Sequence, residues 1–168
     1  RYPLVTGVQT CALPISENSP YFMTGARMNY PIGSKDEISL FLLTGWQRIA
    51  PLKGNSLPAA GWQWTHKAGK NNTLNWSFFL GSEFPDSERR MRYFNNLYWQ
   101  GENGNWAYRL GLDIGLEQKD PQTGGLSSWY CPTGILEYSF SKKFKSAIRL
   151  ERYADKDKVI AHPANGLP

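Results

Sequence analysis

The sequence has no run of apolar residues long enough to cross a membrane as a helix. Such a helix needs about 20 consecutive apolar residues, whereas the mean hydropathy of this chain is −0.51. A transmembrane β-barrel stays allowed, because its polar lumen and loops keep the average hydropathy low. With 168 residues, of which 40% are hydrophobic and 14% aromatic, the chain fits one folded domain and is too apolar for a disordered tail.

Residues suited to catalysis or to metal binding are also scarce. Histidine and cysteine occur twice each. The sequence contains no Gly-rich nucleotide loop, HExxH motif, paired-cysteine site or Gly-x-Ser-x-Gly elbow. His66 lies in an aromatic segment, and the alternation of Asp155 and Asp157 with lysines is typical of a solvated loop rather than a calcium site. We therefore expect no catalytic residue, no metal and no cofactor.

The charge pattern argues against a nucleic-acid partner. The net charge is +5, which by itself would suit a polyanion. However, the basic residues are scattered singly among acidic ones and form no patch.

The N-terminal segment does not read as evolved protein. VTGVQTCALPI at 5–15 resembles the translated reading frame of a sequencing adapter, so we leave 1–16 out of the fold argument. Cys11 then carries no information, and Cys131 has no disulfide partner. We expect the natural start, including any signal peptide, to be missing, and 161–168 to be a truncated tail.

The most informative segment is 106–117, WAYRLGLDIGLE. Its large apolar residues alternate strictly with small or charged ones such as Arg109, Asp113 and Glu117. Strict period two predicts a β-strand with one apolar and one polar face. Twelve residues suit a tilted strand that crosses a bilayer, which needs roughly 9–11 residues.

Similar segments recur along the chain and predict an antiparallel up-and-down meander of about eight strands. We place these at 21–30, 37–47, 60–67, 73–83, 90–100, 106–117, 129–140 and 144–153, with pairing locally disrupted by Pro132 and Gly134 in the seventh. Short connections, at 31–36, 68–72, 101–105 and 141–143, alternate with long ones, at 48–59, 84–89 and 118–128. Short turns at one end and long loops at the other are typical of outer-membrane barrels. The predicted fold is therefore all-β, with 17–160 forming a transmembrane β-barrel or part of a larger one.

The two faces predict two sets of functional residues. One set would form aromatic girdles at the water–lipid boundaries: Tyr30, Trp46, Trp62, Trp64, Trp76, Trp99, Trp106 and Tyr138. The other would line a water-filled lumen, because charges buried in a dry core would cost several kcal/mol each unless paired: Arg27, Glu83, Arg90, Arg92, Arg109, Asp113, Glu117, Arg149 and Glu151.

Two other functions fit the same pattern of strands. In a soluble lipocalin-like barrel, Leu110, Leu112 and Ile114 would point inward around a lipophilic ligand. A non-conducting surface barrel would instead present its loops to a partner. The direction of the apolar face separates the lipocalin from the membrane hypotheses, and conductance separates a pore from a surface barrel.

Several stretches resemble one known family. These are NSPYFMTGARMNYPIGSKDEISLFLLTGWQRIAPLKGNSLPAAGWQ at 18–63, LNWSFFLGSEFPDSERRMRYFNNLY at 74–98, LGLDIGLEQK at 110–119 and ERYADKDKVI at 151–160. They are similar to Bacteroidetes-type β-barrel porins of the OmpL-like family. The resemblance implies a bacterial outer-membrane channel without catalytic residues, which is embedded in outer-membrane lipid and passes small hydrophilic solutes. Whether it forms a homo-oligomer stays open. Members of the family are longer than this chain, so we expect a fragment.

Overall fold

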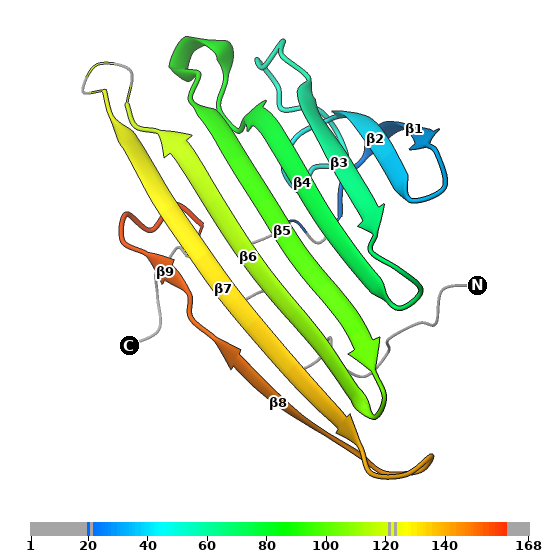
Figure 1. Cartoon of the computed structure of the whole chain (residues 1–168). Helices are drawn as coiled ribbons and strands as arrows, with labels where there is room; N and C mark the ends of the chain where they lie inside the picture. Colours follow the sequence, from blue (N-terminus) through cyan, green and yellow to red (C-terminus); the bar gives the residue numbers. More distant parts are fainter. Residues whose placement is uncertain (1–19, 21, 121, 123, 161–168) are drawn as a thin grey trace.

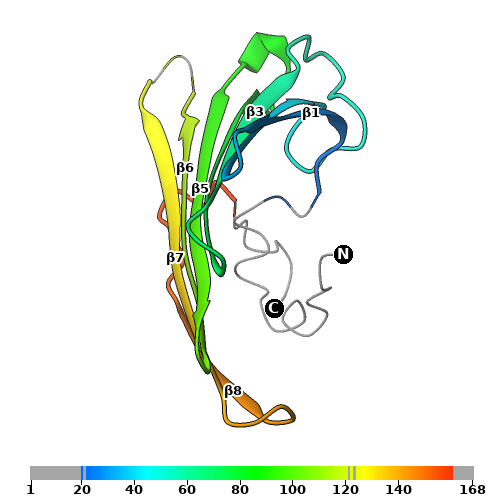
Figure 2. The ribbon, with the colours of Figure 1, turned by 45° about the vertical axis from the view of Figure 1, so that its right-hand side comes forward.

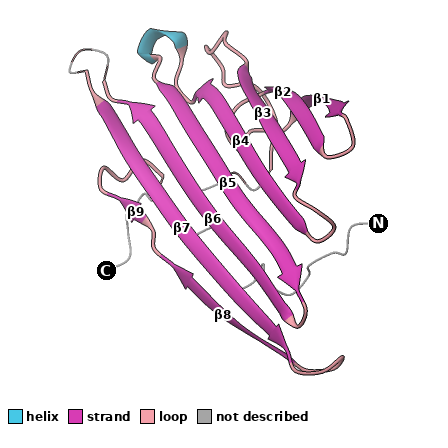
Figure 3. Ribbon diagram, in the orientation of Figure 1, coloured by secondary structure: helices cyan, strands magenta, loops and turns pink. Residues whose placement is uncertain are grey.

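A computed structural model of the chain describes residues 20, 22–120, 122 and 124–160. The described residues form one antiparallel sheet in which β1 to β8 lie side by side in sequence order (Figures 1 and 3). The strands are β1 (Gly25–Ile32), β2 (Asp36–Leu43), β3 (Ala59–Lys67), β4 (Asn72–Ser82), β5 (Met91–Asn103), β6 (Trp106–Gln118), β7 (Leu126–Ser139), β8 (Lys145–Glu151) and β9 (Ala154–Asp155). Asp86–Glu88 forms a short 3₁₀ turn. The predicted all-β meander is confirmed. The predicted terminal segments 1–16 and 161–168 lie outside the described residues.

Connection lengths are segregated as predicted. The connections 33–35, 68–71, 104–105 and 140–144 are short, whereas 44–58, 83–90 and 119–125 are longer. We call the two ends of the sheet the short-turn end and the long-loop end. The turn predicted at 101–105 is shorter in the structure, because Gly101 and Glu102 still pair with Tyr108 and Ala107. Gly104, at φ 60°, then closes the hairpin in a conformation that favours glycine.

Pairing is disrupted on one side of β7 near Pro132, as predicted, whereas Gly134 pairs with both Leu110 and Leu150 and disrupts nothing. β7 runs without interruption along β6. On its other side, pairing with β8 ends at Thr133 and pairing with β9 begins at Tyr130. Between these strands, the Arg152 N–H donates to the Pro132 carbonyl at 3.1 Å. Pro132 has no backbone N–H that could donate to the strand on this side, which accounts for the break.

Register divides the side chains between two faces, because directly paired residues of antiparallel strands lie on the same face. Phe79 pairs with Phe94, Phe94 with Gly115, and Gly115 with Trp129. We call the face that carries this row the inner face and the opposite one the outer face. The sheet is strongly curved (Figure 2). Its most buried large side chains, Trp129 and Phe79, are on the inner face, as expected for the concave side.

The apolar core lies on the inner face near the long-loop end. It consists of Leu43, Trp46, Ala59, Phe79, Phe94 and Trp129. Trp46 is 6% exposed and contacts Phe79 and Phe94 edge-to-face, with ring centroids 5.1 and 5.0 Å apart. Such pairs add about 0.5–1.5 kcal/mol beyond area burial.

The location predicted for Trp46 is therefore wrong, as is the end of the second strand. β2 stops at Leu43 instead of continuing to 47. Gly45 has φ 139° and Gln47 has φ 52°, so the backbone leaves the extended conformation there. The indole is consequently carried to the inner face, away from the outward-facing aromatic residues with which period two had grouped it.

Gly115 should be the glycine of β6 that tolerates substitution least. A Cβ at Gly115 would lie 1.9 Å from Cζ2 of the buried Trp129 ring, whereas a Cβ at Gly111 would meet only Thr133, at 3.8 Å. We expect Gly115→Ala to destabilise the fold by about 1–3 kcal/mol through overpacking, and Gly111→Ala to have little effect. Urea unfolding in detergent, followed by heat-modifiable gel mobility, measures both. Equal stability of the two variants would contradict the packing described here.

Candidate solute-facing surface

The sheet does not close on itself within the described residues. β1 pairs only with β2, and the far edge is formed by β8 and β9, which pair only with β7. This arrangement is consistent with part of a barrel wall. The inner face, which would line a closed barrel, is the candidate functional surface.

The outer face is apolar and exposed. Leu110, Ile148 and Leu150 are 49%, 67% and 73% exposed. Among the described strand residues, the outer positions include no lysine, arginine or glutamate, and Asp36, the first residue of β2, is the one acidic residue. A face of this composition suits contact with acyl chains, since a charge there is costly.

Aromatic side chains of the outer face gather mainly toward the short-turn end, and Trp62 contacts Trp76 of this group with ring centroids 4.7 Å apart. The predicted girdle residues on this face are Tyr30, Trp62, Trp64, Trp76, Trp99, Trp106 and Tyr138. At the short-turn end the Trp106 and Tyr138 ring centroids are 4.6 Å apart. Indole N–H groups have polar partners: Trp64 donates to Asp36 at 2.9 Å and Trp76 to Asn95 at 3.1 Å. Apolar rings with satisfied polar atoms suit a membrane interface; their position at the lipid boundary stays a prediction.

The inner face carries the charges, and near the long-loop end these are paired. Arg92 Nε donates to Glu117 Oε2 at 2.7 Å and Nη2 lies 2.6 Å from the same oxygen, and the two residues are only 7% and 8% exposed. The Arg92 guanidinium also lies 5.4 Å from the Trp46 ring centroid and 5.8 Å from that of Trp129. A buried ion pair between two rings leaves Arg92 little freedom to contact a solute.

Two predicted lumen residues lie just beyond the ends of strands. Glu83 follows β4 and accepts from the Trp46 N–H at 2.7 Å and from Arg48 Nε at 2.8 Å. Arg90 precedes β5. Its guanidinium carbon is 4.5 Å from the centroid of the Phe84 ring, and its Nη2 is 3.5 Å from Asp120 Oδ2. Both residues thus connect the loop 83–90 to the other two long loops.

Other predicted residues form short-range contacts along the inner face. Asn96 donates to Asp113 at 2.6 Å, and Arg149 Nε to Glu151 at 2.7 Å. Arg27 Nη2 donates to Ser39 at 2.9 Å and lies 3.6 Å from Glu37. That these residues line a lumen stays a prediction.

Arg109 differs from the other predicted residues. It lies on the inner face in register with Gln100 and Ile135, nearer the short-turn end than Asp113. Its side chain has no ion-pair or hydrogen-bond partner among the residues that the structure describes. It is therefore a cation available to water or to a solute.

Sequence reasoning missed the amides and hydroxyls between these charges. Gln63 Nε2 donates to Asn75 Oδ1 at 2.6 Å, and Asn75 Nδ2 donates to Ser77 at 2.9 Å. A polar groove of about 380 Å³ opens beside this chain, and it is bordered by Arg27, Thr65, Lys67, Tyr98 and Gln100, among others. The sequence could have indicated these residues, since they are the small and polar residues that alternate with the tryptophans of β3 and β4.

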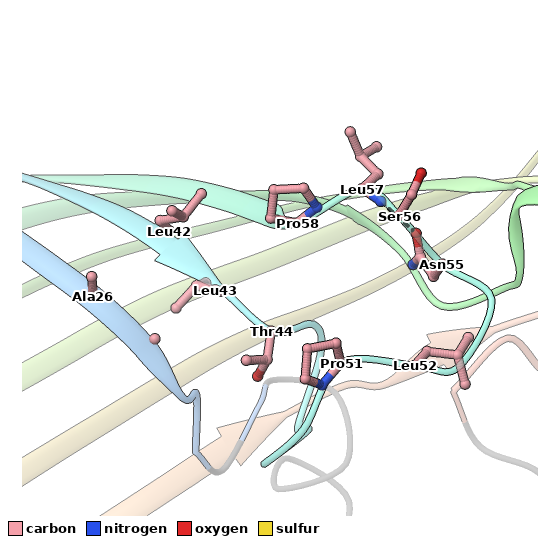
Figure 4. Close-up of a pocket in the computed structure, with 11 residues that line it drawn as sticks. Ala26, Leu42, Leu43, Thr44, Pro51, Leu52, Asn55, Ser56, Leu57 and Pro58 are labelled. Carbon is pink, nitrogen blue, oxygen red and sulfur yellow. Dashed lines mark hydrogen bonds between the residues drawn. The ribbon is translucent and has the colours of Figure 1, made fainter.

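An apolar cavity of about 490 Å³ lies at the other end of the sheet (Figure 4). It lies between the ends of β1 and β2 and the loop residues 51–58, and its lining includes Leu42, Pro51 and Leu57. It is on the edge of the sheet that has no further strand in the described part of the chain.

No helix among the described residues is long and apolar enough to span a membrane. The same residues contain no cluster of three or more His, Cys, Asp or Glu side chains that could hold a metal ion.

An antiparallel meander with an exposed apolar face and a charged opposite face has the construction of a transmembrane β-barrel wall. The chain belongs to the family described as "Putative beta-barrel porin-2, OmpL-like", whose model matches residues 14–167. The predicted family is thus confirmed.

A search of curated proteins and a search of solved structures each found no match. The family gives the chain a porin-type character and, in general terms, an outer-membrane location, and it suggests a channel rather than an enzyme.

The outer face can be tested with an arginine. We expect Leu112→Arg to destabilise the protein in lipid by roughly 2–4 kcal/mol if the residue is near the bilayer midplane. Thr133→Arg is the matched control, because Thr133 lies one register position away on the inner face, opposite Glu151, where the new cation has a partner. Urea unfolding in lipid vesicles measures both. A lower stability for Thr133→Arg than for Leu112→Arg would reverse the assignment of the faces.

The contact of the loop 44–58 with Asp86 should weaken in acid. Asp86 accepts from Arg89 at 2.5 Å and from the Ser56 N–H at 3.2 Å. These two interactions, chiefly that with Arg89, hold the pKa of Asp86 below its ordinary value. A lowered folded-state pKa means that the link is present at neutral pH and is lost as the pH falls through that pKa, below about 4.

Limited pepsin digestion between pH 2 and 4 measures this weakening. In the wild type, cleavage within 51–58 should increase as the pH falls. Asp86→Asn, which cannot ionise, should be cleaved to the same extent at every pH once enzyme activity is normalised. Identical pH profiles for the two proteins would exclude a role for the Asp86 carboxylate.

Proposed function

We propose that this protein is a channel through which small hydrophilic solutes diffuse passively along the inner face, with outer-membrane lipid against the outer face. The observation that carries the proposal is the distribution of charge: lysine, arginine and glutamate within the described strands all lie on the inner face. Porin walls alternate apolar-out and polar-in for the same physical reason.

Arg109 supports a wet rather than a dry interior. An ionised side chain without a partner would incur a desolvation penalty of several kcal/mol in a low-dielectric core. Water removes this penalty. The amides and hydroxyls around Asn75 can likewise exchange hydrogen bonds with water or with the hydroxyl groups of a passing solute.

The lipocalin-like alternative finds little support in the same geometry. It needs Leu110 and Ile114 to surround a ligand, whereas these side chains are 49% and 41% exposed on the outer face. The family assignment also favours a porin.

Diffusion is tested on the full-length protein in two assays. In planar bilayers we expect discrete, ohmic conductance steps, and in liposome swelling we expect entry of small neutral sugars with an upper size limit. Protein denatured by boiling is the control in both assays. Folded protein that inserts into the bilayer but passes neither ions nor sugars would refute the proposal and would favour a surface barrel.

Arg109 should bias this channel toward anions. A fixed cation that faces the solute path raises the local anion concentration, so Arg109→Gln should lower the anion-to-cation permeability ratio. Lys142→Gln removes the same charge from the exposed short connection 140–144 and should leave the ratio nearly unchanged. Reversal potentials across a KCl gradient measure both. Equal shifts would mean that Arg109 acts only through the net charge of the protein.

A further inference from the structure

The turn 44–48 is bent onto the inner face by an unusual backbone. Gly45 and Gln47 have φ 139° and 52°, and few residues other than glycine adopt positive φ without cost. Thr44 Oγ1 donates to the Arg48 carbonyl at 2.6 Å and closes the turn. The consequence of this turn is the position of Trp46, whose ring lies against Phe79 and Phe94 on the inner face.

Glu83 fixes the turn to the sheet. Its carboxylate binds the turn at two points, the Trp46 N–H at 2.7 Å and Arg48 Nε at 2.8 Å, and its side chain is 10% exposed. The Trp46 indole extends from this anchor over Phe79 and Phe94. At the level of this row the inner face is thus covered by a second layer of protein.

A second segment covers the same row. Tyr153, Val159 and Ile160 pack against the core cluster. The Asp155 carboxylate holds their segment in place by accepting from the N–H groups of Val159 and Ile160, both at 2.9 Å. Two separate parts of the chain therefore reduce the open space above one level of the inner face, whereas the level of the polar groove remains open.

The charges at this level compensate one another. Arg48 pairs with Glu83, Arg92 with Glu117, and Arg90 with Asp120. Compensated ion pairs present little net field to a solute. Arg109, in contrast, lies nearer the short-turn end and has no partner in the described part of the chain.

We propose that the turn 44–48, fixed to the inner face by Glu83 and by the buried Trp46 ring, forms a constriction at the long-loop end of the solute path that selects solutes by size and not by charge. This inference rests on the proposed channel function. It separates two properties along the path: the size limit is set at the Trp46 level, and the charge preference is set at the Arg109 level.

The test uses the full-length protein and the variants Trp46→Ala and Glu83→Ala. Trp46→Ala removes the ring. Glu83→Ala removes the anchor and keeps the ring, so it remains informative if loss of the buried indole prevents folding. Trp99→Ala, in which the ring is removed from the outer face where it is 45% exposed, is the matched control. Heat-modifiable gel mobility establishes that each protein is folded.

For Trp46→Ala and Glu83→Ala we expect higher single-channel conductance and entry of larger neutral sugars in liposome swelling, with the anion-to-cation permeability ratio unchanged. Trp99→Ala should match the wild type in all three measurements. If the wild type conducts and both folded variants keep its size limit, or if they change the permeability ratio alone, the constriction is refuted and the channel stands. If the folded wild type does not conduct, both the channel and the constriction are refuted.

Discussion

Continuous pairing of the backbone in a single register is the constraint on which the rest of this structure depends. In lipid, every backbone N–H and C=O must find a partner within the sheet, because no water is available to replace one. β6 meets this demand through thirteen consecutive pairs with β7 and twelve with β5. Since the side-chain period is two, a slip of one residue would move Arg109 and Asp113 to the outer face and Leu110 to the inner face. Register therefore decides which side chains share a face.

Once register is fixed, the side chains of the inner face pack in two ways, around aromatic rings in one part and through hydrogen bonds between polar groups in another. Where two rings meet, as at Phe94 and Trp129, the strand between them carries Gly115, because a larger residue would occupy the space of the indole. Where no ring is present, amides and hydroxyls such as Gln63 and Asn75 fill the surface and satisfy one another. The choice between glycine, aromatic and amide along one face thus follows from the neighbour across each strand and not from the residue's own strand propensity.

Features that depend on residues close in sequence could be predicted, and those that depend on distant ones could not. The alternation in 106–117 was sufficient to define β6 and to separate Leu110 from Arg109. The position of Trp46 depends on Phe79 and Phe94, which follow it by more than thirty residues, and on the positive φ of Gln47, which no local pattern signals. For the same reason the sequence predicted Arg92 and Glu117 as lumen residues without identifying them as partners, since their pairing appears only when the register of β5 and β6 is known.

Ion pairs occur at both ends of the inner face but differ in burial, since Lys145 and Glu137 pair near the short-turn end with side chains that are 60% and 25% exposed. Arg92 and Glu117 are 7% and 8% exposed; at that depth a single charge would be costly, and only a hydrogen-bonded pair is tolerated. Toward the short-turn end the groove beside Lys67 and Gln100 is open, and Arg109, in register with Gln100, has no partner in the described part of the chain. The aromatic residues Trp46, Phe79 and Phe94 gather near the long-loop end, at the level of the buried Arg92–Glu117 pair. Thus the alternation that separates an apolar face from a charged face across the sheet is joined by a second difference along it, from a level that loop residues cover to a level that is open.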